Sequence, residues 1–224
     1  MIGTNPADLL TIALLFGLLT LLPVIVVTTT SFLKIALVLL VLRNALGIQQ
    51  VPPTIAIYGI TLSLTAFIMA PTLQAVAVEL TTVVSSATST DSKSGGPLMD
   101  RIRVAVEPMR TFMIRFARPD QLESMFDSAK RLWPPEFAAG AAKTDFLILL
   151  PAFVVSELQT GYEIAFLIYV PFVVIDLLIS NLLMALGMQQ VSPQTVSIPL
   201  KLLLFVMVDG WSRLLYALAT SYQP

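Results

Sequence analysis

The stretch that decides the fold runs from Phe146 to Gly187 and reads FLILLPAFVVSELQTGYEIAFLIYVPFVVIDLLISNLLMALG. It is about twice as long as the 20 or so apolar residues that a helix needs to cross a bilayer. The polar segment Glu157–Glu163 interrupts this run, and Pro171 and Asp176 interrupt it again. We interpret the stretch as one interrupted hydrophobic element that is too long for a single span.

The composition of the whole chain places it in or against a membrane. Of its 224 residues, 56% are hydrophobic and 12% are charged, whereas a soluble domain has about 45–50% apolar and about 25% charged residues. The net charge of −1 argues against nucleic-acid binding, which needs a basic surface. The chain has no histidine and no cysteine, which excludes imidazole, thiolate and ordinary zinc chemistry. We therefore expect a protein that is not an enzyme, with no catalytic residue, cofactor or metal.

The charges divide the chain into three parts. Most of them fall in a polar insert, residues 85–145, between a first hydrophobic hairpin in residues 1–84 and a second in residues 146–224. The Ser- and Gly-rich start of the insert, residues 85–97, is typical of a mobile loop. Apolar residues at helical spacing after Pro108 and after Pro119 predict two short amphipathic helices. We expect these helices to form a small subdomain that rests on the hydrophobic part, where they could also dock other subunits.

Three further hydrophobic elements accompany the long one, and the fold class that follows is all-α. The first element is Leu9–Val27, which Pro23 is expected to kink, and Phe32–Leu42 continues it. The others are Pro52–Val78 and Ile198–Ala219. The sequence thus predicts a membrane-associated protein of about four hydrophobic helices in two long hairpins.

A nine-residue segment recurs at the two predicted hairpin tips. Ala45-Leu-Gly-Ile-Gln-Gln-Val-Pro-Pro53 reappears as Ala185-Leu-Gly-Met-Gln-Gln-Val-Ser-Pro193. In each copy a glycine follows an apolar helix, where a left-handed residue ends it, and a proline starts the next helix. Both tips should therefore lie on one side of the molecule, with the termini and the insert on the other. Duplication and convergence both remain open as the origin of the repeat.

Ionisable residues within apolar segments are costly in lipid and are candidates for functional roles. Those that stand out are Lys34, Glu157, Glu163, Asp176, Lys201 and Asp209. They could pair between packed helices or lie near a membrane surface. They could also conduct ions or protons, or face other subunits around a watery channel.

Several motifs, in order along nearly the whole chain, resemble the SctR/FliP family, core subunits of the type III secretion export gate. Only the Ser- and Gly-rich stretch near residue 90 lacks a clear counterpart. The motifs are Thr30-Ser-Phe-Leu-Lys-Ile35, Leu42-Arg-Asn-Ala-Leu-Gly-Ile-Gln-Gln-Val-Pro-Pro53, Phe67-Ile-Met-Ala-Pro71, Glu107-Pro-Met-Arg-Thr-Phe-Met113, Ser156-Glu-Leu158, Pro171-Phe-Val-Val-Ile-Asp-Leu177, Leu183-Met-Ala-Leu-Gly-Met188 and Ile198-Pro-Leu-Lys201.

The resemblance implies a hetero-oligomeric pore in the bacterial inner membrane. Several copies of the chain would assemble with SctS/FliQ-like and SctT/FliR-like subunits around a passage for unfolded secreted proteins. The chain would be multi-pass, with its tips toward the cytoplasm, its insert on the periplasmic side and much of the assembly above the membrane plane. The injectisome branch is favoured over the flagellar one, because flagellar relatives often begin with a cleavable signal sequence that we do not find here.

The resemblance also implies roles for particular residues. In the family, consecutive methionines at the second hairpin tip are thought to form a deformable gasket; here only the first of them is kept. The gate set at the second tip is Met184, Gly187, Met188, Gln189 and Gln190. The first tip comprises Arg43, Asn44, Gly47, Gln49 and Gln50, and the residues expected to form buried charge pairs in assembly are Lys34, Glu157, Asp176, Lys201 and Asp209.

Two other functions compete with the gate. A small ion-coupled transporter would use Glu157, Asp176 and Asp209 as relay carboxylates, and it would act without partners. A scaffold without a pore would show no change in membrane leakage when Met188 at the second tip is replaced by glycine.

Overall fold

The computed structural model describes residues 6–48, 51–88 and 103–223, and every regular element in these ranges is a helix. The all-α prediction is therefore confirmed. In chain order the helices are α1 (Pro6–Thr29), α2 (Phe32–Ala45), α3 (Thr54–Thr88), α5 (Glu107–Phe116), α6 (Pro119–Leu132), α7 (Pro135–Ala139), α8 (Phe146–Ala185), α9 (Pro193–Met207) and α10 (Gly210–Thr220).

The hydrophobic helices match the four predicted elements. Helix α8 and the Thr54–Thr82 part of α3 are each long and apolar enough to cross a membrane. Two bent pairs meet the same test together: α1 from Leu19 onward with α2, at 75°, and α9 with α10, at 62°. The described chain therefore has two candidate spans, or up to four if each bent pair counts as one.

The predicted interruptions of the long apolar stretch are wrong, because α8 is one continuous helix of 40 residues. Pro151 and Pro171 lie inside it, and the polar segment 157–163 does not break it. At 1.5 Å per residue it is about 60 Å long, roughly twice the hydrocarbon thickness of a bilayer. Its polar segment is held by other parts of the chain, as described below.

The first hydrophobic element bends by 75° between α1 and α2, after Thr29, and Pro23 lies within α1. The hydroxyls of Thr28, Thr29 and Thr30 each donate to the carbonyl four residues earlier, over 2.6–2.8 Å. The backbone N–H of Phe32 then donates to Thr30 Oγ1 over 3.3 Å. The Thr30 hydroxyl thus accepts the backbone N–H of the first residue of α2, at the bend.

Helix α2 forms the centre of the molecule, because it packs against both α8 and α3. Its side chains Ile35, Val38, Leu39 and Leu42 are at most 1% exposed. They belong to one hydrophobic core that also takes in residues of α3, α8, α9 and α10. The two hairpins are therefore held together around a short helix that most of the chain covers.

The insert contains the two predicted amphipathic helices, α5 and α6, followed by the short α7. Helix α5 packs against α3 and α8, through a second core that includes Phe112, Met113 and Phe153. Residues 85–88, expected to begin a mobile loop, instead continue α3. The rest of that predicted loop, up to residue 97, lies outside the described residues.

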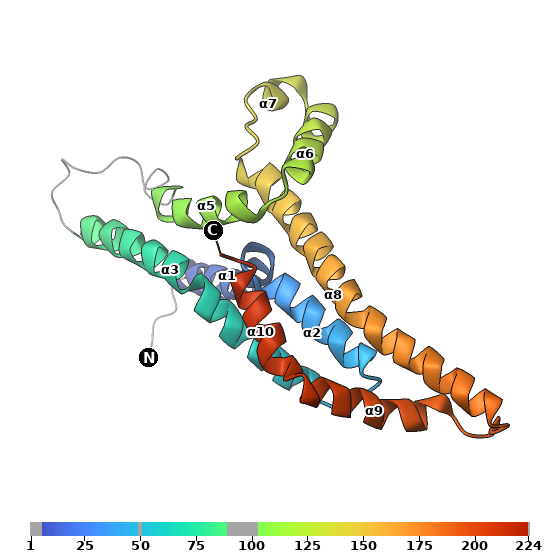
Figure 1. Ribbon diagram of the computed structural model, residues 1–224. Helices are drawn as coiled ribbons and strands as arrows, with labels where there is room; N and C mark the ends of the chain where they lie inside the picture. Colours follow the sequence, from blue (N-terminus) through green and yellow to red (C-terminus); the bar gives the residue numbers. More distant parts are fainter. Residues whose placement is uncertain (1–5, 49–50, 89–102, 224) are drawn as a thin grey trace, which may run out of the picture.

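Both hairpin tips lie at one end of the molecule, and the insert and the end of α10 lie at the other (Figure 1). The repeated tip segment predicted this arrangement, because each hairpin brings the chain back to the side from which it started. The second tip extends farther than the first, because α8 has 40 residues and α2 has 14. The two tips, although alike in sequence, therefore have different surroundings.

Candidate functional site

The two glycines of the repeated segment follow their helices with nearly the same backbone conformation. Gly187 has φ of +73° and Gly47 has φ of +76°, both in the left-handed region that favours glycine. At the second tip the N–H of Met188 donates to the Leu183 carbonyl over 2.9 Å, and the N–H of Gly187 donates to the Met184 carbonyl over 3.1 Å. This is the Schellman pattern of helix termination.

The second tip exposes large apolar side chains. Met184 is 60% exposed, Leu186 is 64% exposed and Met188 is 46% exposed. Gln189 and Gln190 are also exposed on the same turn. Contiguous exposed apolar residues mark contact with another chain or with lipid. All five residues of the predicted gate set thus lie together at the far end of α8.

The first tip packs against other parts of the chain on one side and is exposed on the other, where Val51 is 63% exposed. Arg43 Nη1 donates to Thr54 Oγ1 over 2.9 Å and so joins α2 to α3, whereas Asn44 is exposed. A Cβ atom on Gly47 would lie 3.0 Å from Cγ1 of Ile198, so this tip packs closely against α9. Of the predicted residues of this tip, Gln49 and Gln50 lie outside the described residues.

Lys201 joins three helices near the first tip. Its Nζ lies 2.6 Å from Oδ2 of Asp176 in α8 and 3.0 Å from the carbonyl of Ala45 at the end of α2. The lysine side chain is 4% exposed, and the aspartate side chain is 43% exposed. An ammonium group at a helix C-terminus is stabilised by the helix dipole. The structure therefore places the predicted Asp176 and Lys201 side chains in one ion pair within a single chain.

Lys34 and Glu157 form a second, more deeply buried ion pair. Lys34 Nζ lies 3.7 Å from Glu157 Oε1, and the two side chains are 3% and 2% exposed. The hydroxyl of Tyr222 donates to Glu157 Oε2, and Lys34 Nζ lies 3.5 Å from the centre of the Tyr222 ring. Burial, with the Glu157 carboxylate beside it, raises the pKa of the Tyr222 phenol, so the hydroxyl stays protonated and donates.

Tyr222 is the residue of this cluster that sequence reasoning missed. No motif includes it, and its role depends on α10 returning to the insert. Its ring packs against Phe112 and Phe116 of α5, with ring centres 6.0 Å and 5.0 Å apart. The end of the chain thus joins α2, α5 and α8 in one place.

Asp209, predicted to form a buried pair between helices or between subunits, has no ion pair with another described residue of this chain. It is exposed at the bend between α9 and α10, with φ of +53°. Its Oδ1 accepts a hydrogen bond of 2.9 Å from the hydroxyl of Ser212. A pairing of Asp209 with a neighbouring chain stays a prediction.

The polar segment of α8 also fastens the insert. The backbone N–H of Arg118, just before α6, donates to Ser156 Oγ over 2.9 Å, and Arg118 Nη1 lies 2.9 Å from Glu163 Oε1. Residues 156–163 therefore hold α2, the insert and the chain end at one junction. Over the described part of the chain, no three Asp or Glu side chains gather where they could hold a metal ion.

Comparison with known proteins identifies the family. The sequence model of the FliP family matches residues 15–218, from the first hairpin through the insert to the second hairpin. The chain belongs to the FliP family. The resemblance inferred from the motifs is therefore confirmed.

Relatives of this FliP-family chain are similar over nearly their whole length. Harpin secretion protein HrpW of Pseudomonas syringae pv. syringae is 50% identical over 211 residues, which cover 94% of this chain and 99% of the relative. Harpin secretion protein HrcR of Erwinia amylovora is 46% identical over 220 residues, covering 98% and 99%. Yop proteins translocation protein R of Yersinia pestis is 45% identical over 222 residues, covering 96% and 97%.

Proposed function

We propose that this FliP-family chain is a core subunit of a type III secretion export gate, which conducts unfolded substrate proteins across the bacterial inner membrane. The names of its relatives, harpin secretion and Yop translocation proteins, support a role in secretion. In this proposal several copies assemble with SctS/FliQ-like and SctT/FliR-like subunits, and the insert lies on the periplasmic side. The chain itself carries out no chemistry.

The observation that carries the proposal is the exposed apolar tip of the second hairpin. Met184, Leu186 and Met188 are exposed at the end of α8. Methionine is unbranched and polarizable, so its side chain can repack around surfaces of different shape. A ring of such tips could close a passage and still yield to a polypeptide of any sequence.

The two glutamines at the second tip make the proposed constriction more polar. Gln189 and Gln190 stand where the family's gasket has further methionines, and both are exposed. Their amides would bring hydrogen-bonding groups to the constriction. The apolar part of the seal would then rest on Met188 together with Leu186 and Met184, which are exposed on the same tip.

The transporter hypothesis finds less support in the geometry. Glu157 and Asp176 are 19 positions apart on one continuous helix, about 28 Å at 1.5 Å per residue. Each carboxylate is also engaged by its own lysine, Lys34 or Lys201. Proton transfer between carboxylates needs hydrogen-bond contact or an intervening water, which this separation does not offer.

The decisive experiment replaces Met188 by glycine. This substitution removes an apolar side chain from the tip and changes no residue of α8, which ends at Ala185. We expect cells that express the assembled complex to leak small dyes and ions, because the apolar seal is reduced. Two matched controls should not leak: Met188→Leu, which keeps an apolar side chain, and Val51→Gly, which removes an exposed apolar side chain from the first tip.

Unchanged leakage in the glycine variant would favour a scaffold without a pore. Co-expression with neighbouring genes and native mass spectrometry provide a second test. A monodisperse hetero-oligomer supports the gate, whereas a lone monomer or dimer that transports ions would overturn it.

A further inference from the structure

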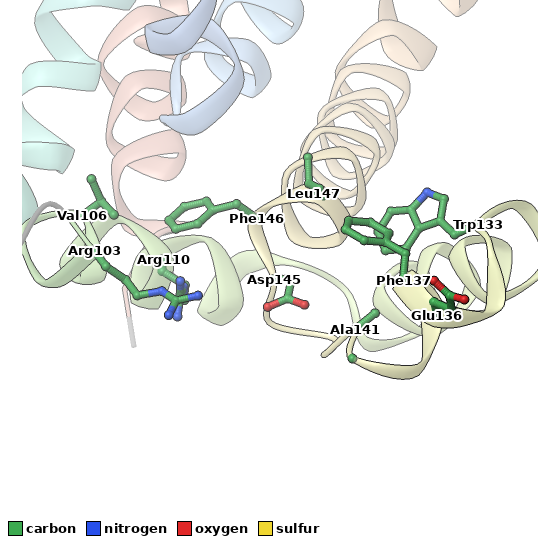
Figure 2. A pocket seen from close by; sticks show the side chains of 11 residues that line it. Arg103, Val106, Arg110, Trp133, Glu136, Phe137, Ala141, Asp145, Phe146 and Leu147 are labelled. Atoms are coloured by element: carbon green, nitrogen blue, oxygen red, sulfur yellow. The ribbon is translucent and has the colours of Figure 1, made fainter. Parts of the chain in front are cut away.

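A hollow of about 580 Å³ lies in the insert, at the end of the molecule opposite to the hairpin tips. Its volume falls in the range of about 300–1,000 Å³ that is usual for small-molecule sites. The segment that leads into α5 borders it on one side, the end of α6 with α7 borders it on the other, and α8 begins between them (Figure 2). None of the roles discussed above uses this hollow. In the proposed function the insert lies on the periplasmic side, so a ligand would arrive from water.

Two arginines stand on the α5 side of the hollow (Figure 2). Arg103 is exposed and has no ion-pair partner among the residues that the structure describes. Arg110 stacks its guanidinium over the Phe146 ring, 4.8 Å from the ring centre, which restricts its orientation. Its Nη1 atom also lies 3.3 Å from Oε2 of the exposed Glu107. Planar guanidinium groups bind carboxylates through paired hydrogen bonds, so this side of the hollow suits a carboxylate.

Two carboxylates also line the hollow. Glu136 lies on the α7 side, away from the arginines, and Asp145 lies between the two sides (Figure 2). Neither forms an ion pair with another described residue. Oδ2 of Asp145 accepts the N–H of Ala142 over 2.8 Å, and its Oδ1 has no hydrogen bond within the described part of the chain. The hollow thus holds charges of both signs that do not neutralise one another, which fits a ligand with opposite charges at its two ends.

The remaining lining is apolar and aromatic. The rings of Trp133 and Phe137 meet edge to face, with centres 4.9 Å apart, and Phe137 and Leu147 are exposed. Apolar and aromatic surface beside a few polar groups is the usual composition of a ligand site, in which the polar groups fix the orientation. Tryptophan and arginine are also the residue types in which the binding energy of protein interfaces often concentrates. The hollow therefore suits a ligand with an apolar body between its charged ends.

We propose that this hollow binds a short peptide with free ends, taken from the surrounding water. The C-terminal carboxylate lies against Arg103 and Arg110, and the N-terminal ammonium group lies against Glu136. Between them a peptide N–H donates to Asp145, and an apolar side chain packs on Trp133.

The spacing of the charges favours a peptide over a single amino acid. An amino acid carries both of its charges on one carbon, whereas the arginines and Glu136 stand on opposite sides of the hollow (Figure 2). Each residue of an extended chain adds up to about 3.3–3.6 Å of reach, so a chain of a few residues can join the two sides. Only the compartment from which the peptide comes rests on the proposed export function.

Tryptophan fluorescence can report on the site directly, because the chain has two tryptophans and only Trp133 lines the hollow. The full chain, in uncharged detergent micelles and a Trp211→Phe background, is titrated with the tripeptide alanyl-leucyl-alanine. We expect a saturable change in the emission of Trp133. Blocking either end of the tripeptide, by C-terminal amidation or N-terminal acetylation, should raise the apparent Kd about tenfold, the ratio expected for the loss of one hydrogen bond to a charged group. Free leucine should also bind about tenfold more weakly, because it cannot reach both sides.

The reverse background, Trp133→Phe, is the matched control because it reports on Trp211 in α10, which should not respond to the peptide. If both tryptophans respond alike, or if the blocked peptides bind as tightly as the free one, the hollow does not recognise the peptide ends and the proposal is wrong. An unchanged Trp133 signal with every peptide would also overturn it. Peptide binding and leakage through the export complex are measured separately, so the failure of one proposal is distinguishable from the failure of the other.

Charge variants assign each end of the peptide to its side chain. Arg103→Gln should lower the preference for a free over an amidated C-terminus from about tenfold to less than about threefold, and it should leave the preference for a free N-terminus unchanged. Glu136→Gln should have the reverse effect. The controls Arg115→Gln and Asp127→Asn change exposed charges of the insert that do not line the hollow, so both preferences should persist in them.

All four side chains changed are exposed, so circular dichroism should show unchanged helix content. Equal effects in variants and controls would overturn the proposal. It would also be overturned if Trp133 no longer responded to the peptide in the assembled complex, because another chain would then cover the hollow.

Discussion

Replacing Lys34 by methionine tests whether the Lys34–Glu157 pair holds the fold together. The two charged atoms are 3.7 Å apart and both side chains are almost fully buried. At an effective dielectric constant of 20, this separation corresponds to an attraction of about 4.5 kcal/mol. Removing one partner of a buried pair typically costs about 3–5 kcal/mol, because the other charge is left without compensation. We expect Lys34→Met to lower the free energy of unfolding by that amount.

The double variant Lys34→Met/Glu157→Gln shows where the cost arises. It removes both charges, and its glutamine oxygen can still accept the hydroxyl of Tyr222. We expect it to recover at least half of the stability lost in the single variant, because no charge is then stranded. Denaturant titration of the full chain in mixed micelles, followed by circular dichroism, measures all three free energies.

The matched control is Lys143→Met, which breaks an exposed ion pair with Glu123 at 3.0 Å. Exposed pairs contribute about 0–1 kcal/mol, so this variant should be nearly as stable as the parent. The reasoning fails if Lys34→Met costs no more than Lys143→Met. It also fails if the double variant is less stable than Lys34→Met alone, since the loss would then reflect packing and not a stranded charge.

Three further substitutions test other parts of the structure. Tyr222→Phe removes the hydroxyl bonded to the buried Glu157 and should lower the unfolding free energy by about 1.5–3 kcal/mol in the same titration; a change below 0.5 kcal/mol would contradict the contact. Gly187→Ala puts a Cβ at a residue with φ of +73° and should cost about 1–2 kcal/mol, whereas Gly17→Ala, inside α1 with open space around it, should not destabilise. Lys201→Ala leaves Asp176 and the end of α2 without their cation and should abolish assembly on blue-native gels; intact complexes that cannot secrete would instead indicate a gating role.

The long apolar stretch Phe146–Gly187 shows both the strength and the limit of pattern reasoning. Its length and hydrophobicity correctly predicted a helical element longer than one span. The polar segment 157–163 was expected to interrupt it, yet α8 is continuous. The reason is that the charges in this segment have partners: Lys34 pairs with Glu157, and Arg118 pairs with Glu163. A sequence pattern reports the presence of charge but not what will neutralise it.

For the repeated tip segment, too, the sequence predicted the local turn but not its surroundings. Glycine at the helix end and proline soon after predicted two alike turns, and Gly47 and Gly187 adopt nearly equal φ angles. The pattern could not predict that Gly47 of the first tip packs against Ile198 of α9, whereas Gly187 of the second tip has open space around it. That difference arises because α8 is much longer than α2 and carries its tip beyond the shared core.

The sequence by itself determined the helices, the hairpin turns, the amphipathic insert and the family. The helices, turns and insert depend on hydrophobic periodicity and on Gly and Pro preferences, which act over a few neighbouring residues. The family was recognised from motifs that occur in order along the chain. Only the tertiary structure decided the partners: Tyr222 reaches Glu157 across 65 positions, and Lys201 reaches the carbonyl of Ala45 across 156. A buried charge requires a partner, but which one it meets depends on how whole helices pack, and no local pattern contains that information.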